Sequence, residues 1–397
     1  MSTAPAAQRV RGPVITAWSA VSPYGIGHAA FTDGVREGRS TDSPVDAETW
    51  QSPDERACLV PDFDIRAVLG KASTRSMDRV TGLAVTAVRE LFAEAEAAQN
   101  PVPAGAGTAL VLGTTLGSAQ SQHDFVRASF EEAKPYDVDP RRMPNTLMNC
   151  AAAATAIRFD LKGPNSTVAG GRMSGLLALG YARRLLAAGR TERALVGAVE
   201  EYSRSRAWID RHSRGADDDR GDRPGALLGE GCAMLLLEPA AGESEGAGAA
   251  AQPDGAEGHA RTALAELLAI DIRADVRDDP AATLRESIAH ALGEAGVTPD
   301  QVWAATAGEL PGPLGADERR LLTEVFGEPV TARGRGHELL GDTAAVSGIF
   351  QLTTLLVRAA EEAEAADRFA VITSVDEYGM IACAVLRLPA QNGGVNQ

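Results

Sequence analysis

Short apolar runs recur along this chain, and turn-forming residues separate them from one another. Runs of this length that are rich in Val, Ile and Leu are typical of strands buried in a sheet. The first run ends in Ser-Pro-Tyr-Gly at residues 22–25, which predicts a strand stopped by a turn. The predicted strands cover residues 14–21, 108–113, 194–198, 231–239, 301–306, 369–373 and 381–388.

Between these runs, apolar residues recur with the helical period, which predicts helices over residues 76–96, 174–189 and most of 340–360. The apolar face of the first of these helices is formed by Val80, Leu83, Ala84, Val88 and Leu91. Strands that alternate with helices are typical of the α/β class, and we expect largely parallel sheets.

Two segments of the chain are echoed later in it. Met-Ser-Gly-Leu-Leu-Ala-Leu at residues 173–179 resembles Val-Ser-Gly-Ile-Phe-Gln-Leu at residues 346–352. Cys-Ala-Met-Leu-Leu-Leu-Glu-Pro at residues 232–239 resembles Cys-Ala-Val-Leu-Arg-Leu-Pro at residues 383–389. Two matched motifs at similar separations indicate an internal duplication, with chance similarity between apolar strands as the alternative.

The composition changes at residues 240–260, which are almost wholly Ala, Gly, Glu, Pro and Asp. Such a segment has nothing to bury and is typical of a solvated linker. It divides the chain into an N-terminal half at residues 11–239 and a C-terminal half at residues 261–390. We expect flexible ends at residues 1–10 and 391–397.

Size and charge narrow the possible functions. A chain of 397 residues exceeds the usual size of a single core, which agrees with two fused halves. A net charge of −16 argues against nucleic acid or an anionic membrane as a partner. The sequence contains no apolar run long enough to span a bilayer and no apolar secretion signal at its start, so we expect a cytoplasmic protein.

The residues that usually bind metals are scattered. The four cysteines form no CxxC pair, and the six histidines show no HExxH spacing. The sequence therefore predicts no metal site, no disulfide framework and no cofactor.

Several segments together resemble one family, although none of them would be specific alone. They are Val-Ile-Thr-Ala-Trp-Ser-Ala-Val-Ser-Pro-Tyr-Gly at residues 14–25, Ser-Met-Asp-Arg at 76–79, Met-Pro-Asn at 143–145, Asn-Cys-Ala-Ala-Ala at 149–153, Leu-Lys-Gly-Pro-Asn at 161–165 and Gly-Glu-Gly-Cys-Ala-Met-Leu-Leu-Leu-Glu at 229–238. Through them the chain resembles the β-ketoacyl-acyl-carrier-protein synthases over nearly its whole length. The resemblance implies a thiolase-like, five-layered α-β-α-β-α duplication with two pseudo-symmetric halves, which works as a dimer.

In this family, one cysteine at a helix N-terminus takes the acyl chain, and two histidines stabilise the enolate formed when malonyl-carrier protein loses carbon dioxide. The resemblance of residues 163–175 to the nucleophile motif places Arg172 at the cysteine. The first histidine motif falls on Ala-Gly-Glu-Leu-Pro-Gly at residues 307–312, which places Glu309 at that histidine.

The second histidine corresponds to Asp342 if residues 341–352 align without a gap, and His337 then replaces a family lysine. A rival alignment uses Gly336 and His337 as the family's glycine-histidine pair, but it requires an insertion before residue 347. The glycine-rich gating motif near the C-terminus is replaced by Ser-Val-Asp-Glu-Tyr-Gly at residues 374–379.

All three catalytic positions are thus altered. Arginine stays protonated and cannot act as an acyl nucleophile. Its charge at a helix N-terminus opposes the helix dipole, and an unpaired buried charge is very costly. We therefore expect Arg172, Glu309 and Asp342 to form an ion cluster that plugs the pocket, with a solvent-facing Arg172 as the alternative.

A condensing-enzyme fold without its nucleophile resembles the chain length factors, the β subunits of type II polyketide synthases. This implies a heterodimer with an active ketosynthase α subunit, in which the β subunit completes the acyl tunnel and limits chain length. The acyl carrier protein would interact only indirectly, through that partner, because both it and this chain are acidic. Aromatic-polyketide members usually carry glutamine at the cysteine position, so arginine favours another branch, such as one making polyenes by highly reducing cycles.

Residues 117–130 correspond to the helix whose bulky side chains block the tunnel in aromatic relatives. Ser118, Ser121, Gln122 and Phe125 fall at or near the blocking positions, with Phe125 as the expected floor. The alternative is an interface helix without a gating role.

Two other functions remain open. The fold could carry an acyltransferase or hydrolase that uses Ser174 as its nucleophile, although no histidine is predicted beside it. A stand-alone homodimer that retains an acyl pocket as a binding scaffold is the other possibility.

Overall fold

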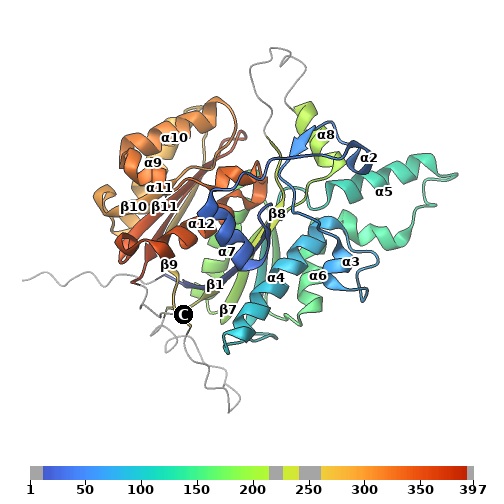
Figure 1. Ribbon diagram of the computed structural model, residues 1–397, viewed down its shortest axis with the longest axis horizontal. Coiled ribbons are helices and arrows are strands. Elements are labelled where there is room, and N and C mark those ends of the chain that lie inside the picture. Colours follow the sequence, from blue (N-terminus) through green and yellow to red (C-terminus); the bar gives the residue numbers. More distant parts are fainter. Residues whose placement is uncertain (1–11, 214–226, 241–260, 391–397) are drawn as a thin grey trace, which may run out of the picture.

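The computed structural model describes residues 12–213, 227–240 and 261–390 (Figure 1). The flexible ends expected at residues 1–10 and 391–397, and the expected linker apart from Ala240, lie outside the described residues. None of the helices in the described ranges is long and apolar enough to cross a membrane.

One continuous sheet runs through both halves in the order β10-β11-β12-β9-β1-β8-β7-β5-β6. The first half contributes β1 (Val14–Ser22), β5 (Thr108–Thr114), β6 (Asn165–Ala169), β7 (Arg193–Glu200) and β8 (Gly231–Glu238). The second half contributes β9 (Ala265–Ala274), β10 (Val302–Thr306), β11 (Arg368–Val375) and β12 (Met380–Leu388). The halves join where the first residues of β1 pair with those of β9.

The same strand pattern occurs twice. In the order β1-β8-β7-β5 the successive pairings are antiparallel, antiparallel and parallel, and β9-β12-β11-β10 repeats all three. This repetition confirms the two pseudo-symmetric halves. The expectation of largely parallel sheets is wrong, because the closing strand of each half, β8 or β12, runs antiparallel to both of its neighbours.

The two ends of the sheet differ. The first half adds β6 beyond β5, and no other described strand pairs with the outer side of β6. At the opposite end, α11 (Glu328–Arg333) packs against β10, where Arg333 Nη1 donates to the carbonyl of Trp303 at 3.3 Å. All five residues of β10 are buried, whereas none of β6 is. One end of the sheet is therefore covered and the other is open.

The helices form three layers around the two parts of the sheet (Figure 1). The central layer is α7 (Ser174–Ala187) and α12 (Ser347–Glu361), which share a core with strands of both halves. The outer layer of the first half contains α4 (Arg79–Ala97) and α6 (Cys150–Arg158). The outer layer of the second half contains α9 (Pro280–Ala295) and α10 (Pro313–Phe326). The predicted five-layered α-β-α-β-α fold is confirmed.

Smaller elements connect these layers. They are β2 (Gly25–Ile26), α1 (Gly27–Glu37), β3 (Ser43–Pro44), α2 (Ala47–Trp50), β4 (Arg56–Ala57), α3 (Ile65–Leu69), α5 (Ala119–Glu131), α8 (Arg204–Ser213) and the 3-10 turns η1 (Pro140–Thr146), η2 (Gly171–Met173), η4 (Pro299–Gln301), η5 (His337–Leu340), η6 (Ala344–Val346) and η7 (Ala363–Ala365).

Two predicted helices begin later than the sequence pattern indicates. The helix α4 starts at Arg79 because the carboxylate of Asp78 caps it, accepting from the amide of Thr81 at 3.0 Å. The helix predicted from residue 340 starts at Ser347. Before it, Asp342 forms a bridge with Leu228, and this backbone pairing holds the chain in a non-helical conformation. That turn delivers Asp342 to the candidate site.

Candidate functional site

Arg172 lies in η2, immediately before the central helix α7, and only 6% of it is exposed. Gly171 precedes it with a φ of 57°, and a Cβ there would lie 2.7 Å from a carboxylate oxygen of Asp376. A side chain at residue 171 would therefore meet both a strained backbone and a collision. The glycine lets the second half of the chain approach Arg172 closely.

Three groups from the second half bind Arg172. Its Nη2 donates to Oδ1 of Asp342 at 2.6 Å, and its Nη1 donates to the carbonyl of Gly308 at 3.0 Å. Its backbone N–H donates to Oδ2 of Asp376 at 3.1 Å. The solvent-facing alternative for Arg172 is wrong. The guanidinium instead joins the two halves, and the carboxylate of Asp342 balances its charge beside the N-terminus of α7.

Asp342 is itself held on several sides. Its Oδ1 also accepts from the backbone N–H of Ala344 at 2.9 Å, and its carbonyl accepts from Arg206 Nη2 at 2.8 Å and from the N–H of Gly229 at 2.9 Å. Because both its backbone and its carboxylate are bound, Asp342 presents a fixed anion to Arg172.

Glu309 does not take the place that the sequence suggested. Its Oε2 pairs with Arg319 Nη1 on α10 at 2.5 Å. Its backbone adopts a left-handed conformation with a φ of 53°. The carbonyl of the preceding Gly308 accepts a hydrogen bond from Nη1 of Arg172. The expected ion cluster of Arg172, Glu309 and Asp342 is therefore wrong with respect to Glu309. The ion pair consists of Arg172 and Asp342.

His337 is buried in the second half, where its Nδ1 lies 3.5 Å from the hydroxyl of Thr306. Among the described residues, its Nε2 has no hydrogen-bond partner. Burial holds the pKa of His337 below its ordinary value, although the nearby Glu338 and Glu309 oppose this. The imidazole is therefore neutral at neutral pH and adds no charge to the Arg172–Asp342 pair.

A carboxyl group that the sequence reading missed lies behind this site. Oε1 of Glu318 accepts from the amide of Gly308 at 3.1 Å and from the hydroxyl of Thr373 at 2.7 Å. The signal was present in α10, because Glu318 lies three and four residues before Leu321 and Leu322 on the buried face. A carboxyl group on the apolar face of a helix marks a buried polar site.

Replacing Glu318 by glutamine is expected to flatten the pH dependence of stability. Burial raises the pKa of Glu318 from 4.5 to about 7, so in this window the folded protein keeps a proton that the unfolded chain has released. The stabilisation is complete below 4.5 and is lost as the pH rises through about 7. Urea unfolding of both proteins from pH 4 to about 8 measures the difference. Parallel curves for the two proteins would contradict the assignment.

The four tunnel candidates lie on or beside α5. Ser118 is its N-cap: the side chain accepts from the amide of Ser121 at 3.1 Å, and the buried hydroxyl lies 3.1 Å from Oε1 of Glu201. Ser121 donates to Oδ2 of Asp78 at 3.3 Å. Both serines therefore bond to carboxyl groups, of Asp78 and of the buried Glu201, and anchor the helix.

Gln122 and Phe125 lie one turn further along α5. Gln122 Nε2 donates to the carbonyl of Leu116 at 2.6 Å, which folds this side chain back over the start of the helix. Phe125 is half-buried and remains the candidate for the tunnel floor.

Comparison with known proteins identifies the framework that carries this site. The protein-family model described as "Beta-ketoacyl synthase, N-terminal domain" matches residues 12–242, which is more than half of the chain. The chain belongs to the β-ketoacyl synthase family. The family predicted from the sequence motifs is thereby confirmed.

Individual β-ketoacyl synthases and related structures extend the similarity to the second half. A solved structure, the ishigamide ketosynthase/chain length factor, has a TM-score of 0.85 at 43% identity and covers 95% of this chain and 99% of that chain. The actinorhodin polyketide putative beta-ketoacyl synthase 2 of Streptomyces coelicolor is 26% identical over 94% of this chain and 98% of its own length. The 3-oxoacyl-(acyl-carrier-protein) synthase 2 of Coxiella burnetii is 25% identical over 80% and 78%.

Proposed function

We propose that this chain is a non-catalytic chain length factor, the β subunit of a type II polyketide synthase. It pairs in the cytoplasm with an active ketosynthase α subunit, completes the acyl tunnel and sets chain length while malonyl-carrier protein is condensed. One observation carries the proposal: a buried arginine, held by Asp342 and Gly308, occupies the position where the family resemblance places the nucleophilic cysteine. It needs neither a metal nor a cofactor of its own.

The contacts of Ser174 disfavour the rival acyltransferase or hydrolase. Its hydroxyl lies 2.9 Å from the carbonyl of Thr114 and 2.7 Å from that of Gly171, and it accepts from the amide of Gly170 at 2.9 Å. The residue is fully buried, and these backbone contacts give its hydroxyl a structural role at the start of α7. A serine nucleophile needs an adjacent base, whereas the hydrogen bonds of the Ser174 hydroxyl go to backbone groups.

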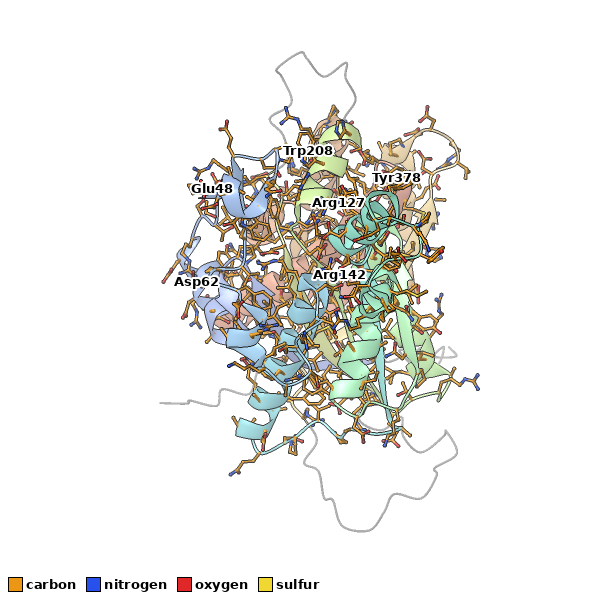
Figure 2. The ribbon with its side chains drawn as sticks, turned by 90° about the vertical axis from the view of Figure 1, so that its right-hand side faces the viewer. Glu48, Asp62, Arg127, Arg142, Trp208 and Tyr378 are labelled. Atoms are coloured by element: carbon orange, nitrogen blue, oxygen red, sulfur yellow. The ribbon has the colours of Figure 1, made fainter. Side chains whose placement is uncertain are left out.

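The open end of the sheet supports a protein partner. An unpaired edge strand offers a row of backbone donors and acceptors to a second chain, and a cluster of exposed apolar residues marks an interaction surface. Figure 2 looks onto this face, where Arg127 of α5 and Arg142 of η1 are labelled. Exposed apolar side chains of α5, η1, α6 and the segment between the last two are Val126, Phe130, Met143, Leu147, Met148 and Ile157.

The comparison supports a ketosynthase as that partner. The relative with 43% identity is the ishigamide ketosynthase/chain length factor, and its name combines the two kinds of subunit. Because this chain carries a net charge of −16, we propose that the acidic carrier protein docks on the partner. The stand-alone homodimer would use the same surface, so purification of the chain alone and with a ketosynthase separates the two.

We place the protein in a branch apart from the actinorhodin type. Its identity to the actinorhodin relative is 26%, against 43% to the ishigamide relative. Arginine in place of the usual glutamine also favours this assignment, and a highly reducing, polyene-forming pathway is the proposal for the branch.

Reconstitution of malonyl condensation tests the function. A cysteine-bearing ketosynthase, malonyl-carrier protein and the remaining pathway enzymes are assayed with and without this chain, and products are read by mass spectrometry. We expect product only when the chain is present and no acyl group on the chain itself. Equal product without it, or a covalent acyl adduct on any of its residues, would contradict the proposal.

In the same assay, replacing Phe125 by alanine is expected to lengthen the main product, because the proposed floor of the tunnel becomes smaller. Replacing the exposed Phe130 of the same helix, which is 83% exposed in the single chain, by alanine is the matched control. It is expected to weaken assembly with the partner and to leave product length unchanged. An unchanged product from the Phe125 variant would remove this residue from the tunnel.

A further inference from the structure

Two adjacent carboxyl groups at the end of β7 hold the loop that leads into α5. Glu200 accepts from the hydroxyl of Thr115, which lies 2.8 Å from both of its carboxylate oxygens, and from the amide of Thr115 at 3.3 Å. Glu201 binds the far end of the loop, through the hydroxyl of Ser118 at 3.1 Å and the amide of Gln120 at 3.3 Å. Both glutamates are 1% exposed, so each end of the loop is fixed from within the fold.

The loop itself has a defined path. Gly117 has a φ of 68°, and a Cβ at this position would lie 2.9 Å from the Cα of Met148. Its amide donates to the hydroxyl of Thr114 at 3.1 Å. The two glutamates hold residues 115–120 in place, and these residues set the position at which α5 begins.

Further polar contacts hold α5 within the single chain. The amide of Ser205 on α8 donates to Oε1 of Gln120 at 3.1 Å, and its hydroxyl lies 2.8 Å from Nδ1 of His123. Ala119 is the only buried residue of the helix among those described. A helix normally takes its place by packing an apolar face against the core. Because α5 buries so little apolar surface, polar contacts of its first turns and of the loop before it set its position.

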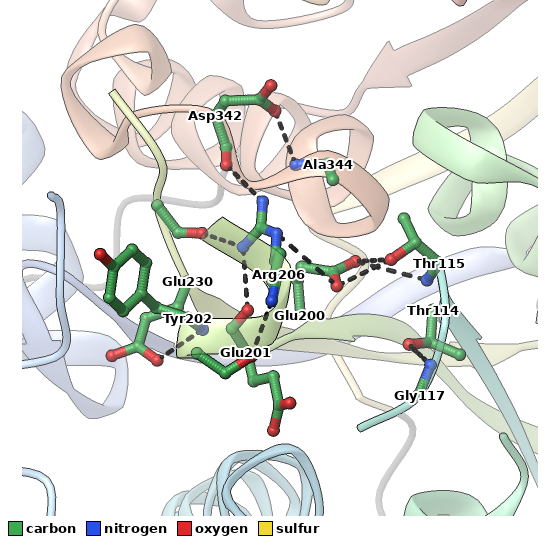
Figure 3. A network of polar contacts seen from close by, with 12 residues as sticks. Thr114, Thr115, Gly117, Glu200, Glu201, Tyr202, Arg206, Glu230, Asp342 and Ala344 are labelled. Carbon is green, nitrogen blue, oxygen red and sulfur yellow. Dashed lines mark hydrogen bonds and ion pairs between the residues drawn. The ribbon is translucent and has the colours of Figure 1, made fainter. Parts of the chain in front are cut away.

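Arg206 on α8 connects these glutamates to Asp342 of the Arg172–Asp342 pair (Figure 3). Its Nη1 donates to the carbonyls of Glu201 at 3.0 Å and Gly229 at 2.6 Å, and its Nη2 donates to the carbonyl of Asp342 at 2.8 Å. Its Nε lies 4.0 Å from Oε1 of Glu200. A continuous series of contacts thus runs from Thr115 through Glu200, Arg206 and Asp342.

The charges in this network are compatible with deep burial. Burial, reinforced by Asp78, raises the pKa of Glu201 to about 8, so this carboxyl group is largely protonated at neutral pH. Burial also raises the pKa of Glu200, and Arg206 opposes that shift most strongly. Arg206 can therefore balance the charge of Glu200, while the largely protonated Glu201 needs no counter-ion.

We propose that Glu200, Glu201 and Arg206 form an anchor that sets the position of α5 relative to the Arg172–Asp342 pair, and that they thereby determine product length. None of the three needs to touch the acyl chain, so they are positioning residues. The inference rests on the proposed function, in which α5 carries the floor of the tunnel.

Thr115 offers a test that leaves Arg206 and Asp342 intact. Thr115→Val keeps the shape of the side chain and removes the hydroxyl that donates to Glu200, whereas Thr115→Ser keeps that hydroxyl. In the complex with its ketosynthase partner, the valine variant is expected to raise the ratio of off-length to parent-length product on the order of tenfold, the effect of losing one hydrogen bond to a charged acceptor. The serine variant is expected to keep the parent distribution.

Total condensation, thermal melting and the size of the complex are measured alongside product length. Ser118→Ala releases the other end of the loop and is expected to broaden the products in the same way, so the test does not depend on one variant folding. A parent distribution from both Thr115→Val and Ser118→Ala in intact complexes would overturn the anchor.

The failure of the anchor and the failure of the proposed function give different results. If the anchor is wrong but the function is right, omission of the chain abolishes product and Phe125→Ala changes its length, while Thr115→Val does not. If the function is wrong, omission of the chain leaves product formation unchanged, and no variant of it alters product length.

Discussion

Replacing Arg172 by alanine is expected to lower the free energy of unfolding by about 3–5 kcal/mol, the cost of breaking a buried ion pair by removing one partner. The guanidinium is 2.6 Å from Asp342, with side-chain exposures of 6% and 17%. The substitution leaves the Asp342 carboxylate without its guanidinium partner, removes a donor from the carbonyl of Gly308 and opens a cavity between the halves. Urea denaturation followed by circular dichroism measures the change.

An exposed arginine pair provides the control for this experiment. Arg335 pairs with Glu328 at 2.9 Å, but the side chains are 55% and 58% exposed. Replacing Arg335 by alanine is expected to cost less than about 1 kcal/mol, because water screens such pairs. Similar losses for the two alanine variants would mean that Arg172 does not act as a buried clamp.

Restoring a cysteine at residue 172 is expected to yield an unreactive thiol. Catalytic cysteines are activated by a helix N-terminus or a neighbouring cation, which favours the thiolate. Here Asp376 already takes the backbone N–H of residue 172, and the carboxylate of Asp342 faces its side chain. We expect alkylation of Arg172→Cys by iodoacetamide at neutral pH to be at least about tenfold slower than that of free cysteine, since each unit of raised pKa removes nine-tenths of the thiolate.

Peptide mapping by mass spectrometry distinguishes residue 172 from the four native cysteines, which are all free thiols. The matched comparison carries Asp342→Asn and Asp376→Asn in addition to the cysteine, which removes both negative charges and keeps the side-chain size. This triple variant is expected to react faster than the single one. Equal rates would show that burial alone, and not the carboxylates, controls the thiol.

The duplicated fold could be predicted from the sequence because each half repeats the same local pattern. The motifs at residues 173–179 and 346–352 start α7 and α12, which form the central layer. The strand directions could not be predicted in this way. An apolar run has the same composition whether its neighbour is parallel or antiparallel, so the mixed sheet depends on contacts distant in sequence.

The site was predicted in part for a similar reason. Arg172 and Asp342 could be placed by the motifs around them, whereas the side chain of Glu309 depends on a left-handed backbone and on Arg319 ten residues later. Nothing in the sequence connects Asp376 to the backbone of Arg172, since 204 residues separate them. The anchor is equally remote, because Glu200 and Glu201 look like the ordinary polar end of a strand.

The unequal ends of the sheet bear on how many copies can join. If the proposed partner adds a strand at β6, it uses the open edge of the main sheet in the described chain, while α11 packs against β10 at the other end. A partner of the same fold would bring the same asymmetry, so edge-to-edge growth ends after a single union. The proposed pairing would therefore stop at two subunits and leave no open edge from which fibres could grow.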